Sequence, residues 1–158
     1  MVRAMLATAL AASLGVSAPA SAAPVGCFGR SYDARHLRSH PQQQVSRMWL
    51  RLELADASKG EGRFALAVTL RGKRQSWSAG GTCRAAAEAW TCQPDTDGDP
   101  PLVMALAGPT LKLDNPRGLK VFDDVTGPDL NTARIGAPGD GVFQLRQAPG
   151  RECEVFDR

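Results

Sequence analysis

The chain of 158 residues lacks the residue spacings that identify the common enzyme classes. It has only two histidines and one tyrosine, and aromatic residues make up 6% of its length. The serine-hydrolase motif Gly-x-Ser-x-Gly, the zinc-protease motif His-Glu-x-x-His and a glycine-rich phosphate loop are all missing. No enzyme is therefore indicated, although a triad of Ser, His and Asp assembled only by the fold stays open, because triads are recognised by geometry.

A long apolar run is missing everywhere except at the start of the chain. There, Arg3 precedes an apolar stretch from Met5 to Val16, and Ala20-Ser21-Ala22 has the small-x-small form of a signal-peptidase site. A membrane helix needs about 20 consecutive apolar residues, whereas serine, glycine and proline interrupt this stretch from Ser13 onward. We therefore predict a cleaved signal peptide over residues 1–22.

Removing the signal peptide leaves residues 23–158, a length that suits a single domain with a sizeable core. This mature part contains no apolar run of transmembrane length. Export places it in the periplasm or outside the cell, which are oxidising compartments. Its four cysteines are therefore expected to form disulfides.

The spacing of the cysteines favours one of the three possible pairings. Cys83 and Cys92 are separated by eight residues that fit a hairpin connection, so they can face each other across two neighbouring strands. The other pair is then Cys27 with Cys153, which ties together the two ends of the domain. A redox-active role is disfavoured because no Cys-x-x-Cys pair is present. Lipid attachment at Cys27 stays an alternative, although Pro24 stands where such sites have leucine.

Charge is distributed unevenly along the mature chain. Residues 23–84 carry 11 basic and 4 acidic side chains, whereas residues 85–158 carry 7 basic and 12 acidic ones. The two halves thus have charges of +7 and −5, and the sum of +2 predicts no general attraction to nucleic acid or lipid. Mutual compensation between the halves is favoured over a basic binding face.

Apolar residues alternate with other residues along two stretches, as expected for strands with one buried face. Met48 to Leu54 is the first and Phe64 to Leu70 the second, with a hairpin loop predicted over Ala55 to Gly62. Gly72 follows Arg71 and suits the first central position of a type II′ turn. Six further short strands are indicated, at Gln75–Cys83, Ala89–Gln93, Leu102–Ala107, Thr110–Leu113, Leu119–Phe122 and Val142–Arg146.

The eight strands predict an all-β fold. Turns such as Gly108-Pro109 and Asn115-Pro116-Arg117-Gly118 link them closely, which favours an antiparallel meander. A meander of about eight strands removes its exposed edges by closing into a small barrel or sandwich, and we favour the barrel. The segment from Asp123 to Gly141 has no apolar periodicity, so it is predicted to be a long loop of the kind that often carries function.

One short helix is predicted before the strands. Asp33 can cap it, Ala34 to Ser39 form it, and Pro41 ends it by disfavouring helical geometry at His40. His36 and His40 are four residues apart, a spacing that on a continuous helix would place both rings on one face for Zn²⁺ or another ligand. Because the proline interrupts the helix and no carboxylate accompanies the pair, capping or packing roles are favoured.

Three aspartates alternate in the sequence Asp-Thr-Asp-Gly-Asp, at Asp95, Asp97 and Asp99. This resembles the start of a Ca²⁺-binding loop, in which alternate residues point inward. Pro100 and Leu106 occupy the sixth and twelfth positions, where an EF-hand needs glycine and glutamate, so that motif is excluded. An Asp-rich turn is favoured, and a surface Ca²⁺ site is the alternative.

The tryptophans Trp49, Trp77 and Trp90 fall on or beside predicted strands. Trp49 lies on the strand face opposite Leu50 and Leu52, so we predict that it is half-exposed. It is therefore a candidate for a binding surface, although cross-strand packing is the commoner role of such a residue.

The segment from Tyr32 to Val45 carries a resemblance to a family of small exported bacterial proteins. The shared residues are Tyr32-Asp33, His36-Leu37, His40-Pro41, Gln43 and Val45, together with Cys92 followed by Asp97-Gly98. The resemblance implies that this segment is a unit rather than a linker, and it implies no activity or cofactor. Asp99 stands where that family has a second glycine.

These observations lead us to expect a non-enzymatic binding or structural module of the periplasm, with an envelope component as its partner. An inhibitor of an exported hydrolase is a first alternative, with the Asp123 to Gly141 loop as the blocking element. A protein that binds a divalent metal or small ligand is a second. No cofactor is implied unless Ca²⁺ or Zn²⁺ binds at the aspartates or histidines described above, and no nucleic-acid partner is expected.

Overall fold

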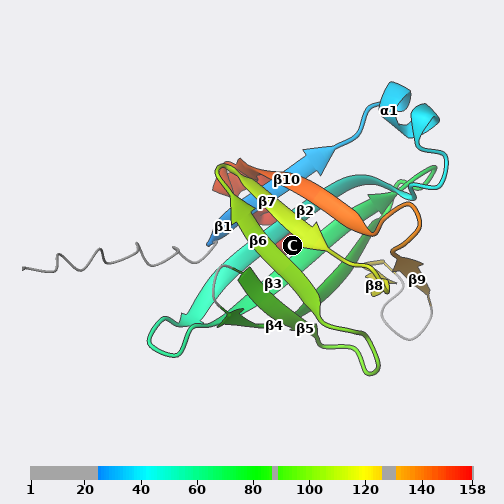
Figure 1. Ribbon diagram of the computed structural model, residues 1–158. Coiled ribbons are helices and arrows are strands. Elements are labelled where there is room, and N and C mark those ends of the chain that lie inside the picture. Colours follow the sequence, from blue (N-terminus) through cyan, green and yellow to red (C-terminus); the bar gives the residue numbers. More distant parts are fainter. Residues whose placement is uncertain (1–24, 87–88, 126–130, 158) are drawn as a thin grey trace, which may run out of the picture.

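Ten antiparallel strands surround the core of the protein in the computed structural model, which describes residues 25–86, 89–125 and 131–157 (Figure 1). The strands are β1 (Gly26–Ser31), β2 (Val45–Asp56), β3 (Glu61–Leu70), β4 (Ser76–Ala86), β5 (Ala89–Pro94), β6 (Leu102–Ala107), β7 (Thr110–Asp114), β8 (Leu119–Asp123), β9 (Thr132–Ile135) and β10 (Val142–Ala148). A short helix, α1 (Ala34–Ser39), follows β1, and a 3-10 helix, η1 (Gly150–Asp157), follows β10.

Eight of these strands form a closed barrel, which confirms the predicted fold class. Strands β1 to β7 are neighbours in chain order, and β10 closes the ring by pairing with both β7 and β1. The remaining strands, β8 and β9, form a hairpin that joins the first residues of β4, where Trp77 pairs with Asp123. Strand β4 thus pairs with β8 near its beginning and with β5 further along.

The interior of the barrel is filled by the apolar residues that alternate along the strands. The predicted inward faces are confirmed for Met48, Leu50 and Leu52 on β2 and for Phe64 to Leu70 on β3. Leu54 departs from the pattern and is 42% exposed. It lies two residues before the end of β2 and pairs with Gly62, over which the ring of Trp90 lies inside the barrel.

Two strands of the fold were not predicted from the sequence patterns. Strand β1 contains two glycines and only three buried residues, so it shows no clear alternation. Strand β9 lies inside the segment from Asp123 to Gly141 that was predicted to be a loop, and that prediction is wrong over Thr132–Ile135. β9 has four residues with a single buried position, and it forms only because β8 offers an open edge. Residues 126–130 of the segment are outside the described residues.

The turns are tighter than expected. The predicted hairpin loop from Ala55 to Gly62 shrinks to residues 57–60, because β2 continues to Asp56 and β3 begins at Glu61. Gly72 has a φ of 74°, as its turn requires, but the amide of Lys73 donates to the Leu70 carbonyl at 3.0 Å. Gly72 therefore occupies the second central position of that turn rather than the first.

The N-terminal helix is confirmed with its predicted boundaries. The Asp33 carboxylate accepts a hydrogen bond from the His36 amide at 2.7 Å, and His40, which precedes Pro41, leaves helical geometry with φ −123° and ψ 72°. The guanidinium of Arg71, just beyond β3, donates to carbonyl groups at the end of the helix, including that of His40 at 3.0 Å. This contact holds α1 beyond one end of the barrel (Figure 1).

Candidate functional site

Both predicted disulfides are present. Cys83 and Cys92 face each other across β4 and β5, with their Cα atoms 4.0 Å apart. Cys27 and Cys153 join β1 to η1, with their Cα atoms 5.9 Å apart. The sulfur of Cys27, considered above for lipid attachment, is thus bonded to Cys153.

Trp49 is the tryptophan that stands on the outside of the barrel. Trp77 and Trp90 are 4% and 5% exposed and belong to the core, whereas Trp49 is half-buried on the outer face of β2, as predicted. Its six-membered ring lies over Gly29 of β1, and a β-carbon at Gly29 would meet two ring carbons at 1.6 and 1.7 Å. Glycine is therefore needed at position 29 to leave room for the indole.

Three exposed arginines surround this tryptophan. Arg47 precedes it by two residues and faces the same side of β2, and Arg146 of β10 pairs with Gly29 beneath the ring. Arg74 comes from the turn before β4 and shares a groove with Arg47 and Trp49. We call the outer surface formed by Trp49, Arg47, Arg74 and Arg146 the Trp49 face. Within the described residues, these three arginines have no ion pair or side-chain hydrogen bond.

Two grooves border the indole of Trp49. One has a volume of about 190 Å³ and contains Arg47 and Arg74. The other, of about 420 Å³, contains Arg146 together with the carboxylate-bearing Glu152 of η1. Because one aromatic ring separates the two grooves, a ligand that crosses the ring can reach cationic groups on both sides.

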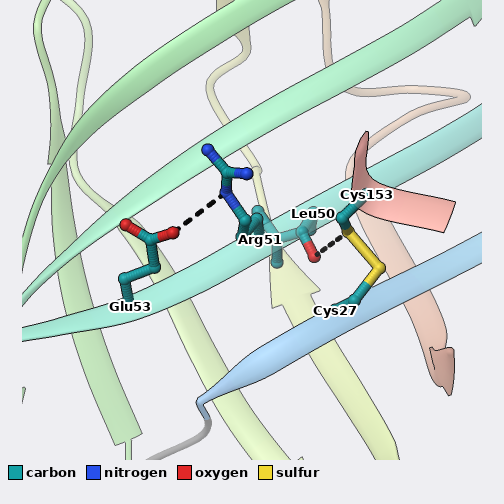
Figure 2. Close-up of a disulfide and its surroundings, with 5 residues drawn as sticks. All are labelled: Cys27, Leu50, Arg51, Glu53 and Cys153. Carbon is teal, nitrogen blue, oxygen red and sulfur yellow. Dashed lines mark hydrogen bonds and ion pairs between the residues drawn. A yellow bond between two sulfur atoms is a disulfide. The ribbon is translucent and has the colours of Figure 1, made fainter. Parts of the chain in front are cut away.

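The C-terminal helix η1 forms one border of the Trp49 face, because Glu152 lines one of the grooves beside Trp49 and Val155 lines the other. A disulfide fastens η1 to β1 (Figure 2). The Cys153 sulfur lies 3.6 Å from the Leu50 carbonyl oxygen. Arg51 of β2 pairs with Glu53 at 3.1 Å, and its guanidinium lies over the Phe156 ring at 5.2 Å. Arg51 is therefore engaged in holding η1 against the barrel, in contrast to the arginines of the Trp49 face.

The ion pairs between described residues do not link the basic half of the chain to the acidic half. Each of the five ion pairs between described residues joins two residues of the same half, as Arg84 with Glu61 and Arg134 with Asp99 do. Strands β1 to β4, which contain most of the basic half, are also consecutive around the barrel. Arg71 of the basic half does act on the charge of Asp140 in the acidic half, so mutual compensation of the two halves stays a prediction.

The two histidines form a stack beside the helix. The ring of His36 lies between those of Tyr32 and His40, with centroid distances of 4.7 and 4.1 Å. The Gln43 side-chain amide donates to the Val45 carbonyl, so its oxygen accepts from Nε2 of His36 at 3.0 Å. Because the two imidazoles are stacked nearly parallel, their free nitrogens do not converge on one ion. Zinc binding here stays a prediction that requires the stack to open.

The predicted Asp-rich turn separates its three carboxylates. Asp95 and Asp97 are exposed, whereas Asp99 is buried and accepts hydrogen bonds from Thr96 Oγ1, the Lys120 amide and Arg134 at 2.5, 2.9 and 2.7 Å. Among the described residues, no three His, Cys, Asp or Glu side chains form a group that could hold a metal ion. Asp99 thus ties this turn to β8 and β9, and calcium binding stays a prediction.

Asp99 is expected to stabilise the fold in a pH-dependent way. Burial opposes its ionisation, but the hydrogen bonds from Thr96, Lys120 and Arg134 outweigh it and lower the pKa of the carboxyl below its usual value. A lowered pKa stabilises the folded state above the unfolded pKa of about 3.9, and this stabilisation is lost as the pH falls through the folded pKa. Asp99→Asn should cost about 2 kcal/mol near neutral pH.

Urea denaturation of both proteins over a pH series measures this effect. The difference between wild type and Asp99→Asn should shrink in acid as the wild-type carboxylate becomes protonated. Asp95→Asn is the matched control, because Asp95 is exposed and lies in the same turn. Equal pH profiles for the two variants would contradict the role given to Asp99.

Sequence patterns did not reveal the buried carboxylate of Asp140. It is 0% exposed and accepts hydrogen bonds from the amides of Gln44 and Val45 at 2.9 and 3.3 Å. Burial raises the pKa of Asp140, and it also raises that of Tyr32, which lies nearby. The described end of the segment from Asp123 to Gly141 thus packs into the barrel end that carries α1, so its Asp140 is structural.

Comparison with known proteins adds no assignment, since no family model, no curated protein and no solved structure matches the chain. The resemblance to small exported bacterial proteins therefore stays a prediction. In the part of the chain that the structure describes, no helix has the length and apolar character needed to cross a membrane. The predicted signal peptide, residues 1–22, is outside the described residues.

Proposed function

We propose that this chain is an exported, non-enzymatic binding module that docks an anionic partner on its Trp49 face. The observation that carries the proposal is the half-buried Trp49 ring with Arg47, Arg74 and Arg146 around it, none of them paired with a described carboxylate. The two disulfides and the predicted signal peptide support an exported location.

The arginines have a chemistry suited to this role. A guanidinium presents a planar set of donors that matches a carboxylate, sulfate or phosphate, and it stays charged at every physiological pH. Arg71 and Arg84 are engaged by the fold, through carbonyl groups at the helix end and through Glu61 respectively. The arginines of the Trp49 face have no such engagement, so their donors are available to a partner.

A titration with polyanions tests the proposal, using polygalacturonate, polyglutamate and an oligothymidylate at low salt. Trp49 reports binding through its fluorescence, because Trp77 and Trp90 are buried. We expect at least one polyanion to bind, with an affinity that falls as salt is added. Arg47→Glu with Arg146→Glu should weaken that binding at least about tenfold, through lost attraction and new repulsion.

Arg63→Glu with Arg117→Glu is the matched control for this experiment. It changes the net charge by the same amount, and Arg63 lies near the start of β3, six residues before Thr69, which lines the groove of Arg47 and Arg74. The control should bind within about twofold of wild type, since its charges lie off the face. Equal losses in the two double variants, or no binding of any polyanion, would refute the proposal.

A further inference from the structure

We infer that the anionic partner is an acidic glycan, with a charged sugar held between Arg47 and Arg74 and a neighbouring sugar ring packed on Trp49. The inference rests on the proposed function and narrows it to one ligand class. Three features of the Trp49 face carry it: the contents of the smaller groove, the half-buried indole, and the separation of the cationic groups on its two sides.

The smaller groove has the donors that a charged sugar needs. In the ladder, Arg47 pairs with Thr69 of β3, and Thr69 pairs with Ser76 of β4, so all three stand on the outer face. The groove therefore combines two guanidinium groups with two hydroxyl groups, and no carboxylate lines it. The hydroxyls of Thr69 and Ser76 make no hydrogen bond to another described residue. Sugars present both charged groups and hydroxyls to such a surface.

The indole of Trp49 supplies a surface for a sugar ring. The C–H bonds on the face of a pyranose are weakly positive, and they pack on the negative face of an aromatic ring. Gly29 and Ala67, the ladder partners of Trp49, have no side chain large enough to enclose the indole. The ring is consequently reachable from the grooves on both of its sides.

The cationic groups on the two sides of Trp49 are too far apart for one sugar. Arg146 on β10 and Arg47 on β2 are separated by two strand spacings around the barrel wall, or about 10 Å. A short oligosaccharide with repeated negative charges covers such a distance across the aromatic ring. Glu152 lies in the groove of Arg146 and makes the opposite side less attractive to an anion. The charged sugar is therefore placed beside Arg47 and Arg74.

Other polyanions fit these features less well. Proteins that bind single-stranded nucleic acid without sequence preference use several aromatic side chains for successive bases, whereas the Trp49 face has one. An acidic peptide would use the arginines but has no need of an open indole flanked by small residues. These two classes become alternative outcomes of the test.

The test compares five probes by calorimetry: a galacturonate oligosaccharide, its fully methyl-esterified form, a heparin-derived tetrasaccharide, polyglutamate and an oligothymidylate. The tetrasaccharide serves as a second acidic glycan. We expect one or both acidic glycans to bind, and methyl esterification to weaken binding of the galacturonate at least about tenfold. Trp49→Ala should weaken the glycan at least about tenfold and leave any polyglutamate binding within about twofold, while Trp49→Phe should retain most glycan affinity.

Melting curves of both Trp49 variants establish that they remain folded. The inference is overturned, with the proposed function intact, if polyglutamate or the oligonucleotide binds on this face as tightly as the glycans. It is also overturned if the esterified sugar binds as well as the acid, or if Trp49→Ala weakens all probes equally. Absence of binding by every probe overturns both the inference and the proposed function.

Discussion

Replacing Cys27 and Cys153 together by alanine should lower the free energy of unfolding by about 5 kcal/mol. The crosslink closes a loop of 126 residues, so its loss returns a large conformational entropy to the unfolded chain. The same dependence of the unfolded chain's entropy on loop length gives about 3 kcal/mol for the Cys83–Cys92 crosslink, which closes a loop of 9 residues. Urea denaturation of the two double-alanine variants against the oxidised wild type measures both values.

The comparison of the two variants controls for the loss of two buried sulfur atoms. All four cysteines are buried to a similar degree, so packing losses are similar and the difference between the variants reports loop length. The Cys27/Cys153 variant should also release η1, which would change the environment of Trp49 and Arg51 at the border of the face. A larger loss from the Cys83/Cys92 variant would contradict this account.

The sequence predicted the local features of this fold well. The cap at Asp33, the helix end at Pro41 and the alternation along β2 and β3 all depend on neighbouring residues, and each is confirmed except at Leu54. The cysteine pairing was also predicted, because the short Cys83–Cys92 spacing leaves only one choice for the other two. Strand β1 was missed because its two glycines break the alternation and one of its partners, β10, lies far along the chain. Strand β9 was missed because only one of its four residues is buried, although its partner is the preceding strand β8.

The candidate site could be predicted only in part. Alternation placed Trp49 on the outer face, but no local pattern links it to Gly29, which lies twenty residues earlier, or to Arg146 near the other end of the chain. Those contacts depend on the register between β10, β1 and β2. Arg146 also belongs to the acidic half of the sequence. Counting charges by halves therefore placed it apart from Arg47 and Arg74, which it joins on the Trp49 face.

The position of the first residues of β2, at the barrel end that carries α1, depends on Asp140. Removing its carboxylate is expected to have the second large effect on the free energy of unfolding. Asp140→Ala should lower the free energy of unfolding by about 3 kcal/mol, because it leaves the buried amides of Gln44 and Val45 without their acceptor. The backbone of Asp140 also bonds to Gly136 and to the Asn115 side chain, so the loop itself stays attached. Asp140→Asn keeps an acceptor oxygen and should cost less.

The pH dependence of stability separates the role of Asp140 as a hydrogen-bond acceptor from the effect of its buried charge. Burial raises its pKa, and the amides of Gln44 and Val45 and the charge of Arg71 offset this only in part. Because the folded pKa lies above the unfolded value of about 3.9, stability falls as the pH rises between these two values and is constant above the folded pKa. Asp140→Asn should abolish that decline.

Thermal unfolding over a pH series checks this prediction, with Asp97→Asn as an exposed control. The control should keep the wild-type pH profile, while Asp140→Asn should differ from wild type most at the pH values where the native carboxylate is ionised. Identical profiles for Asp140→Asn and wild type would show that folding does not shift the pKa of Asp140, which would contradict this prediction. Since Asp140 fixes the start of β2, its alanine variant should also disturb Arg47 and weaken binding at the Trp49 face, whereas Asp97→Asn should not.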